Sequence, residues 1–176
     1  AAEVQEHEHT DAQAQEASIV AAKGGSWSDP ATWSGGTLPV EGDIVTIGEG
    51  MDIVLDVSPP ALHGMNLNGK LSFSDDEDLE LTTEWILMRG ELHIGSESDP
   101  HTRNATITLT NNVSDENINA MGDRGIMIVG GVMSLHGDRG NAWTKLSEPA
   151  EAGSTSIKVL DADGWRVGDE IVLAST

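Results

Sequence analysis

The sequence predicts an all-β protein built as a solenoid, a stack of β-coils, and two observations lead to this fold class. Three segments repeat one order of residue kinds: an apolar strand end, a glycine bend, and an alternating apolar strand. Their bend glycines, Gly69, Gly90 and Gly131, lie 21 and then 41 residues apart, close to one and two units of a common period. Since no helical pattern separates the strands, a period of about 20 residues predicts stacked β-coils.

Composition agrees with one β domain plus a tail. The chain has 176 residues, enough for a single sizeable core. Tyr is absent and aromatic residues make up 3% of the sequence, so Ile, Val, Leu, Met and five Trp must form that core. Short β-branched runs and abundant glycine argue against a helical bundle.

The net charge of −21 restricts the partners. An acidic surface disfavours nucleic acid and anionic membranes, and makes cations such as Ca²⁺ more natural ligands. A polyanionic polysaccharide would need a local basic patch, built from only nine Lys and Arg. Because no apolar run reaches about 18 residues, we also expect no membrane insertion.

The sequence contains no cysteine, which excludes disulfides and thiolate zinc sites. Acidic, cysteine-free chains are common among exported bacterial proteins, so we expect a secreted or cell-surface location. The N-terminus shows no basic and then apolar signal, and we expect any export signal to have been removed.

The composition predicts an acidic tail or linker for the first 22 residues and a folded domain for residues 23–176. Five acids and no Lys or Arg occur between Ala1 and Ala22. His7 and His9 could ligate a metal weakly, but a solvated tail explains them better. Alternatively, the tail lies against a neighbouring molecule and mediates self-association, as exposed strand edges also could.

The next segment predicts a cap at the N-terminal end of the stack. Asp29-Pro30 is a signal for a turn or a helix start and would bring Trp27 and Trp33 onto neighbouring surfaces. Paired indoles can stack on sugars, which makes both residues ligand-binding candidates. A lid over a β core is the more common use of such a pair.

A Gly-Asp turn leads into a strand at two places in the sequence. Gly42-Asp43 precedes the apolar residues 44–47, followed by a second strand at 51–56, and Gly168-Asp169 precedes residues 171–173. We expect each Asp to tie its turn through its own backbone, which is a structural role.

Two acidic clusters are weak calcium candidates. The first contains Asp75, Asp76 and Asp78, and the second contains Asp161 and Asp163. Neither has the ligand spacing of a calcium loop, so solvated or tight turns explain both clusters better.

The sequence contains no phosphate loop, dinucleotide fingerprint, nucleophile motif or zinc-protease helix. A carboxylate pair for glycoside hydrolysis stays open. Polar residues gather at the ends of the glycine-bend strands, where His93 and His136 could meet on one face if the coils stack in register. Ordinary polar strand ends explain this set better than a functional patch does. Its members are His93, Asp123, Arg124, His136, Asp138 and Arg139.

Two tripeptides match the glycosylation sequon, Asn104-Ala105-Thr106 and Asn112-Val113-Ser114. In a bacterial protein they would carry no modification. Residues 106–110 read as an alternating strand, and residues 111–119 as a polar loop suited to partner contact.

The segment from Gly25 to Thr176 resembles the G8 domain, a glycine-marked extracellular module. The resemblance rests on residues 27–33, residues 38–47, the Gly69 and Gly90 bends, and residues 130–137. Residues 130–137 are similar to a Gly-Gly-x-Leu-x-Leu-His-Gly run of cell-surface hyaluronidases. Residues 164–176 are similar to the strand that leads into a longer right-handed β-helix in those proteins.

The resemblance implies a right-handed parallel β-helix that continues into a downstream β-helix of the same chain. It also implies a non-catalytic, exported module of a polysaccharide-binding or polysaccharide-degrading protein, with a hyaluronan-like polysaccharide as the expected ligand class. A structural or adhesive subunit is the alternative. A weaker alternative is that the chain forms part of a glycosaminoglycan hydrolase active site that uses His93, Asp123 and His136. No catalytic residue carries over from the family motifs.

Overall fold

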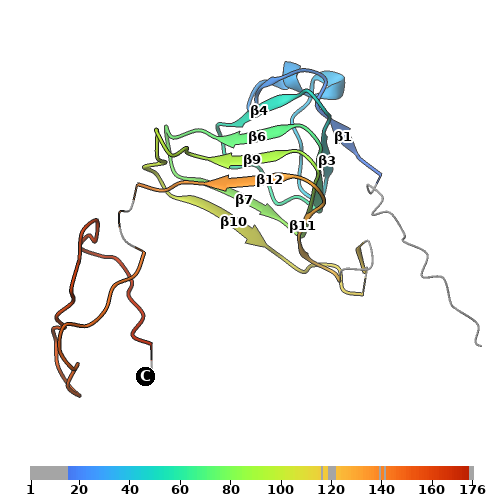
Figure 1. The fold of residues 1–176 in the computed structure, drawn as a ribbon. Helices are drawn as coiled ribbons and strands as arrows, with labels where there is room; N and C mark the ends of the chain where they lie inside the picture. Colours follow the sequence, from blue (N-terminus) through green and yellow to red (C-terminus); the bar gives the residue numbers. More distant parts are fainter. Residues whose placement is uncertain (1–15, 116, 119–121, 139, 141, 175–176) are drawn as a thin grey trace, which may run out of the picture. The chain divides into compact units, whose positions relative to one another are not determined.

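The computed structural model describes residues 16–115, 117–118, 122–138, 140 and 142–174. The chain divides into two compact units, residues 1–136 and residues 137–176. The first unit contains every strand and both short 3-10 turns (Figure 1). In the second unit, an antiparallel bridge joins Leu146 to Val159. No helix in the described part of the chain is long and apolar enough to cross a membrane.

The first unit is all-β, and its strands pair in parallel, as the sequence predicts. The first sheet has the order β1-β3-β5-β8-β11, the second has the order β12-β9-β6-β4-β2, and a short third sheet pairs β10 with β7. The first sheet contains β1 (Ile19–Val20), β3 (Ile44–Ile47), β5 (Gly64–Leu67), β8 (Trp85–Met88) and β11 (Gly125–Ile128). The second contains β2 (Gly25–Ser26), β4 (Asp52–Leu55), β6 (Lys70–Phe73), β9 (Glu91–Ile94) and β12 (Val132–Leu135). The third contains β7 (Leu79–Thr83) and β10 (Ala105–Leu109).

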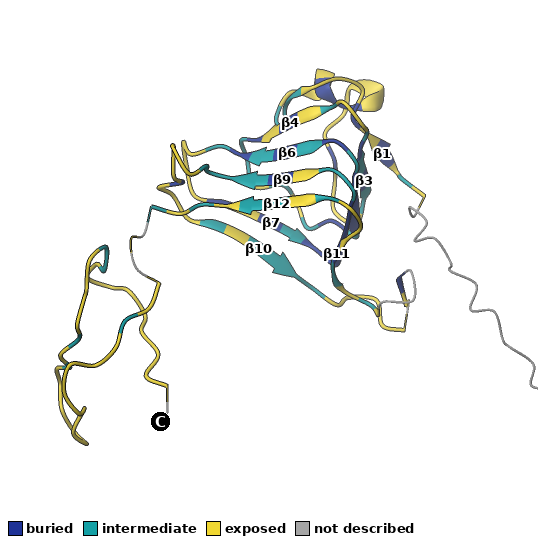
Figure 2. Cartoon of the chain, viewed as in Figure 1, coloured by how far each residue is buried: buried dark blue, intermediate teal, exposed yellow. Residues whose placement is uncertain are grey.

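The chain contributes strands to the first and second sheets in turn, and β7 and β10 of the third sheet are inserted before β8 and β11. In the second sheet, Ile53, Leu71, Leu92 and Met133 occupy one register position from β4 to β12. Ile53, Leu71 and Leu92 are fully buried (Figure 2). The alternation of buried and exposed residues along β4 and β6 therefore places one apolar column of the core between the sheets.

The strands β5 and β8 are buried along their whole length. Their inward residues belong to the main core, whereas Trp85 and Leu87 form a second cluster with Ile118 and Met127. Ile118 comes from the loop between β10 and β11, which the sequence predicts to be a polar loop for partner contact. This residue instead packs against the sheet, since continuous apolar strands need cover on both faces.

The bend glycines form a column in which each lies against the backbone of the preceding coil. A Cβ on Gly69 would overlap the carbonyl oxygens of Gly48 and Met51. A Cβ on Gly90 would overlap the carbonyl of Gly69, and one on Gly131 the carbonyl of Gly90. These three glycines do not have positive φ angles, so close approach of the backbones is what requires them.

The spacing of 41 residues between Gly90 and Gly131 corresponds to one long coil, and the reading of two units was wrong. Gly131 packs directly on Gly90, and β12 pairs directly with β9. The additional residues lie in the loops on either side of β10, residues 95–104 and 110–124. Loops absorb such insertions because they lie outside the ladder of backbone hydrogen bonds.

The predicted lid closes one end of the stack. Asp29 accepts a hydrogen bond from the Ala31 backbone amide and caps the 3-10 turn η1 (Pro30–Thr32), which precedes η2 (Ser34–Gly36). The ring centroids of Trp27 and Trp33 lie 4.7 Å apart in an edge-to-face arrangement. Trp33 Nε1 donates to the Trp27 carbonyl at 2.8 Å, which satisfies its buried polar atom.

The end of the predicted tail takes part in the sheet. β1 pairs with β3, and Ile19 is buried in the main core. Residues 1–15, including His7 and His9, lie outside the described residues. An apolar Ile-Val pair beside an open strand edge gains backbone hydrogen bonds by joining it.

Both predicted Gly-Asp turns form, but only the first leads into a strand. Asp43 Oδ2 accepts from the Val40 amide at 2.8 Å, and Asp169 Oδ2 accepts from the Arg166 amide at 2.7 Å. Residues 44–47 form β3, whereas residues 171–173 form no strand, so that part of the prediction was wrong. A strand needs a neighbouring strand to satisfy its backbone groups, and none pairs with residues 171–173.

We predict that Gly90→Ala destabilises the stack by about 3 kcal/mol, because the new methyl group meets backbone that cannot move aside. Chemical denaturation followed by circular dichroism measures this loss. Gly48→Ala is the matched control at the first bend, where a Cβ would meet only Met51 Cγ at 4.0 Å. We expect a change within about 1 kcal/mol for the control. Equal losses in both variants would contradict the stacked column.

Candidate functional site

A groove of about 420 Å³ follows the bends between the first and second sheets. Gly69 and Gly90 of the glycine column line it, and its wall is formed by the first residues of β4, β6, β9 and β12. Because these glycines have no side chains, the groove exposes backbone next to charged groups. The lining residues are Glu49, Gly50, Met51, Asp52, Asn68, Gly69, Lys70, Arg89, Gly90, Glu91, Gly130 and Val132.

Two of the chain's nine basic residues lie in this groove. Lys70 Nζ lies 3.3 Å from Asp52 Oδ2, and register places Lys70 between Asp52 and Glu91. Arg89 lies at the bend itself, immediately before Gly90. The result is a row of alternating charge with hydrogen-bond donors and acceptors side by side, which suits a polar ligand better than an apolar one.

None of the motifs in the sequence predicts this groove. A signal was nevertheless present, because a polar residue flanks each bend glycine: Asn68 and Lys70 beside Gly69, and Arg89 and Glu91 beside Gly90. Stacking in register collects these residues into one surface, and the register is what the sequence analysis lacked.

Of the two candidate histidines, His93 lies in β9 and His136 directly follows the neighbouring strand β12. His93 Nε2 lies 2.8 Å from Glu91 Oε2, and His93 is in register with Ser134. The Oγ atom of Ser134 lies 3.1 Å from His136 Nε2. Glu91 also lines the groove, so this polar row continues the groove surface along β9 and β12.

The other members of the predicted polar set lie elsewhere. Asp123 accepts from the backbone amides of Asp115 and Asn117 at 3.0 and 3.2 Å, which organises the loop before β11. Arg124 follows it and is exposed. In the second unit, Asp138 pairs with Arg166 at 2.6 Å, and Arg139 lies outside the described residues.

The two lid tryptophans, Trp27 and Trp33, are 1% and 2% exposed. Both indoles pack on the core, so a sugar could reach them only if the lid opened. Their observed role is structural.

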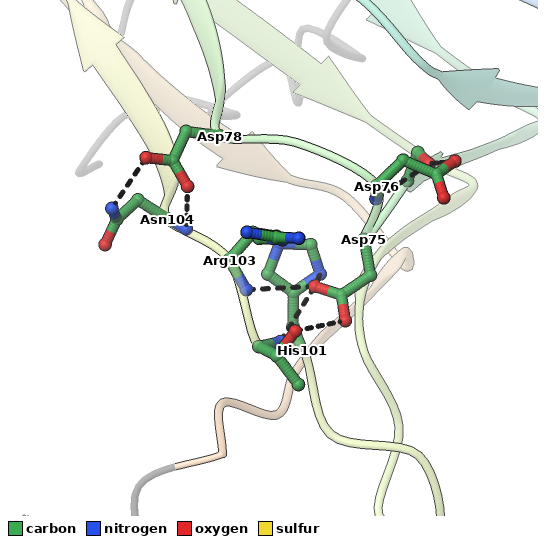
Figure 3. A network of polar contacts seen from close by, with 8 residues as sticks. Asp75, Asp76, Asp78, His101, Arg103 and Asn104 are labelled. Carbon is green, nitrogen blue, oxygen red and sulfur yellow. Dashed lines mark hydrogen bonds and ion pairs between the residues drawn. The ribbon is translucent and has the colours of Figure 1, made fainter.

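The acidic cluster at Asp75, Asp76 and Asp78 holds a neighbouring loop in place (Figure 3). Asp75 accepts from the Thr102 amide, the Thr102 hydroxyl and the Arg103 amide at 2.7–2.9 Å. Asp75 Oδ1 also lies 3.2 Å from Nδ1 of His101, a residue that sequence reasoning missed. Asp78 binds the backbone and side-chain nitrogens of Asn104, whereas Asp76 accepts only from Ser74.

These contacts occupy the carboxylate oxygens that a cation would need. Hydrogen bonding from the Thr102 side chain, with smaller effects from the Arg103 and Thr102 amides and His101, lowers the pKa of Asp75 to about 2. At the second predicted cluster, Asp161 Oδ1 accepts from the Asp163 amide at 2.9 Å, which makes a tight turn. Within the described residues, no three His, Asp or Glu side chains converge as a metal site.

Comparison with protein-family models gives a match to the G8 domain over residues 32–147. The chain belongs to the G8 domain family. Fibrocystin-L from Homo sapiens is 35% identical over 154 residues, a match that covers 86% of this chain and 4% of that protein. Fibrocystin from Mus musculus is 34% identical over 153 residues, with 85% and 4% covered.

A more distant G8 relative, protein rliB from Dictyostelium discoideum, is 26% identical over 162 residues, covering 85% of this chain and 14% of that protein. The G8 chain therefore spans a small part of the relatives it matches. All three come from eukaryotes, so the predicted bacterial source gains no support. No solved structure matches this chain.

We predict that Asp75→Asn lowers thermal stability at neutral pH, and that the difference from wild type disappears in acid. A carboxyl group whose pKa falls from 3.8 to about 2 on folding stabilises the fold above its unfolded pKa. That stabilisation is lost as the pH falls from about 4 to about 2. Melting curves across this range measure the difference.

Asp76→Asn is the matched control, because Asp76 contacts only Ser74 of the same turn. We expect little change for this variant at any pH. A Tm difference between wild type and Asp75→Asn that stays constant down to pH 2 would contradict the stabilising role of the ionised Asp75 carboxylate.

Proposed function

We propose that this G8 chain is a non-catalytic module that closes one end of a longer right-handed parallel β-helix in an extracellular or cell-surface protein. The observation that supports it most is the difference between the two ends of the stack. The right-handedness is inferred because crossover connections between parallel strands are strongly biased to the right-handed form. The location follows from the G8 resemblance.

The first end is closed. Trp27, Trp33 and Thr32 of the lid are buried, and β1 and β2 cover the edges of β3 and β4. Solenoids need such caps because an uncovered first coil would expose core residues and unpaired backbone.

At the second end, no further strand of the first unit pairs beyond β11 and β12. The strands β11 and β12 each lie last in their sheets, and β10 has β7 as its only neighbour in the described structure (Figure 1). The inward column of the first sheet runs through Ile47, Leu67, Met88 and Ile128. The first three are fully buried, whereas Ile128 is 51% exposed.

Ile128 therefore occupies a core position that lacks a covering coil. Leu135 of β12, in register with Ile94 of the core, is likewise 54% exposed. We infer that a further coil of the same protein covers this end, since parallel strands are buried on both faces and carry apolar residues for that reason. The relatives, of which the match covers 4–14%, extend far enough for such coils.

The substitution Ile128→Lys tests the proposal that a further coil covers this end of the stack. In the 176-residue chain the side chain is half exposed, so we expect a change within about 1 kcal/mol. In a longer native product that contains the next coil, the same lysine would be buried without a partner and would cost about 3 kcal/mol or more. Denaturation of both lengths measures the two values.

Val54→Lys is the control, because Val54 is exposed on the outer face of β4 in the middle of the stack. We expect it to be neutral at both lengths. Equal effects of Ile128→Lys at the two lengths would overturn the proposal, as would a native product without further coils.

We propose, as an accessory role, that the groove binds a polysaccharide. Support comes from its volume, its alternating charges and the adjoining polar row of His93, Ser134 and His136. The net charge of −21 opposes a polyanion. A hyaluronan-like chain would therefore bind only through Lys70 and Arg89, with strong salt dependence, whereas a neutral chain would bind through hydrogen bonds.

A glycan panel tests this role with the wild type and the double variant Lys70→Ala/Arg89→Ala. We expect the double variant to lose about tenfold or more in affinity, because hydrogen bonds from charged groups contribute about 1.5–3 kcal/mol each. Lys23→Ala is the control, since Lys23 pairs with Asp29 at the lid, outside the groove. Absence of binding to every glycan, with and without the downstream region, would exclude the role.

A further inference from the structure

The loop between β10 and β11 contains one of the two N-glycosylation sequons in the sequence, Asn112-Val113-Ser114. The other, Asn104-Ala105-Thr106, spans the start of β10. Asn-x-Ser and Asn-x-Thr are acceptors for a bulky glycan, which a folded protein can accommodate only on its surface. Since the relatives are human, murine and amoebal proteins, each of the two sequons is a candidate for this modification.

Asn112 is free to carry a large substituent. All three residues of its sequon are exposed. Asn112 Nδ2 makes a single long hydrogen bond, 3.4 Å to Thr110 Oγ1, which is too weak to restrain it. The backbone just before it is anchored, because the Thr110 amide donates to the Thr83 carbonyl at 3.0 Å. The acceptor nitrogen therefore sits on a fixed backbone and is accessible to solvent.

Asn104 is engaged in the fold. Its backbone amide and its Nδ2 donate to the two carboxylate oxygens of Asp78, at 3.0 and 2.9 Å (Figure 3). Its carbonyl accepts from the Leu79 amide at 2.8 Å, where β7 begins. A sugar on Nδ2 would replace one of its two hydrogens and crowd Asp78 beside the start of β10, which pairs with β7.

We propose that Asn112 is an N-glycosylation site and that the folded, secreted protein carries no glycan on Asn104. In the transfer, Asn112 Nδ2 loses one proton and forms a C–N bond to the anomeric carbon of the first sugar. The bond from that carbon to a lipid-linked pyrophosphate donor breaks. The pyrophosphate leaves with the electron pair and accepts the proton, so that no oxidation or reduction occurs.

The glycan would leave the proposed binding surface free. Asn112 lies at the corner between β10 and β11, whereas the groove follows the bend between β11 and β12. The length of β11, four residues, separates the two. A glycan at the corner would not cover Lys70 or Arg89.

The natural occurrence of this modification rests on the proposed extracellular location, but its test does not. The full chain is expressed behind a secretion leader in a eukaryotic cell, and the secreted material is treated with peptide N-glycosidase. We expect a mobility shift on treatment, with conversion of Asn112 to Asp found by peptide mass spectrometry. Asn112→Gln and Ser114→Ala should each abolish the shift completely.

Thr106→Val is the matched control, because it removes the other sequon and leaves the contacts between Asn104 and Asp78 in place. We expect its secreted protein to shift like wild type. A glycan on Asn104 in secreted protein, or secreted wild-type protein without a glycan on Asn112, would overturn the proposal. Neither result bears on the open end of the stack, which Ile128→Lys tests separately.

Discussion

The close approach of successive backbones at the glycine bends is the constraint on which the rest of this structure depends. Gly69, Gly90 and Gly131 each lie against a carbonyl of the preceding coil, in a space with no room for a methyl group. This contact fixes the register of β6, β9 and β12. Register in turn aligns the apolar columns of the core, because a slip of one residue would turn each column outward.

The same register determines where polar side chains gather. Residues beside the bends, such as Lys70, Arg89 and Glu91, become neighbours only because their glycines stack. The long coil between Gly90 and Gly131 departs from the regular repeat, and carboxylates hold its two loops in place. Asp75 and Asp78 hold the first loop, and Glu84 and Asp123 hold the second. Much of the acidity in this part of the chain therefore has a structural role, and within the described residues these carboxylates do not converge as a metal site.

Local chemistry explains which features could be predicted from the sequence. The repeat of strand, glycine and strand predicts an all-β fold, and Asp29-Pro30 predicts the cap, because both signals depend on short-range geometry. The Gly-Asp turns form for the same reason. Features that depend on long-range pairing could not be predicted: the groove, the single long coil between Gly90 and Gly131, and the role of His101 and Asn104 as partners of Asp75 and Asp78. Residues 171–173 show the same limit, since an Ile-Val run forms a strand only beside another strand.

Hydrogen exchange along the stack tests the central claim most directly, because it measures how well each coil is covered by the next. In the 176-residue chain, the lid closes the first coil, and no described strand pairs with the outer edges of β11 and β12. Amide protection should therefore be highest in β3 to β6 and should fall through β8 and β9 to β11 and β12. In a longer native product, β11 and β12 should become as protected as β5. Equal protection of β5 and β11 in the 176-residue chain would contradict the account.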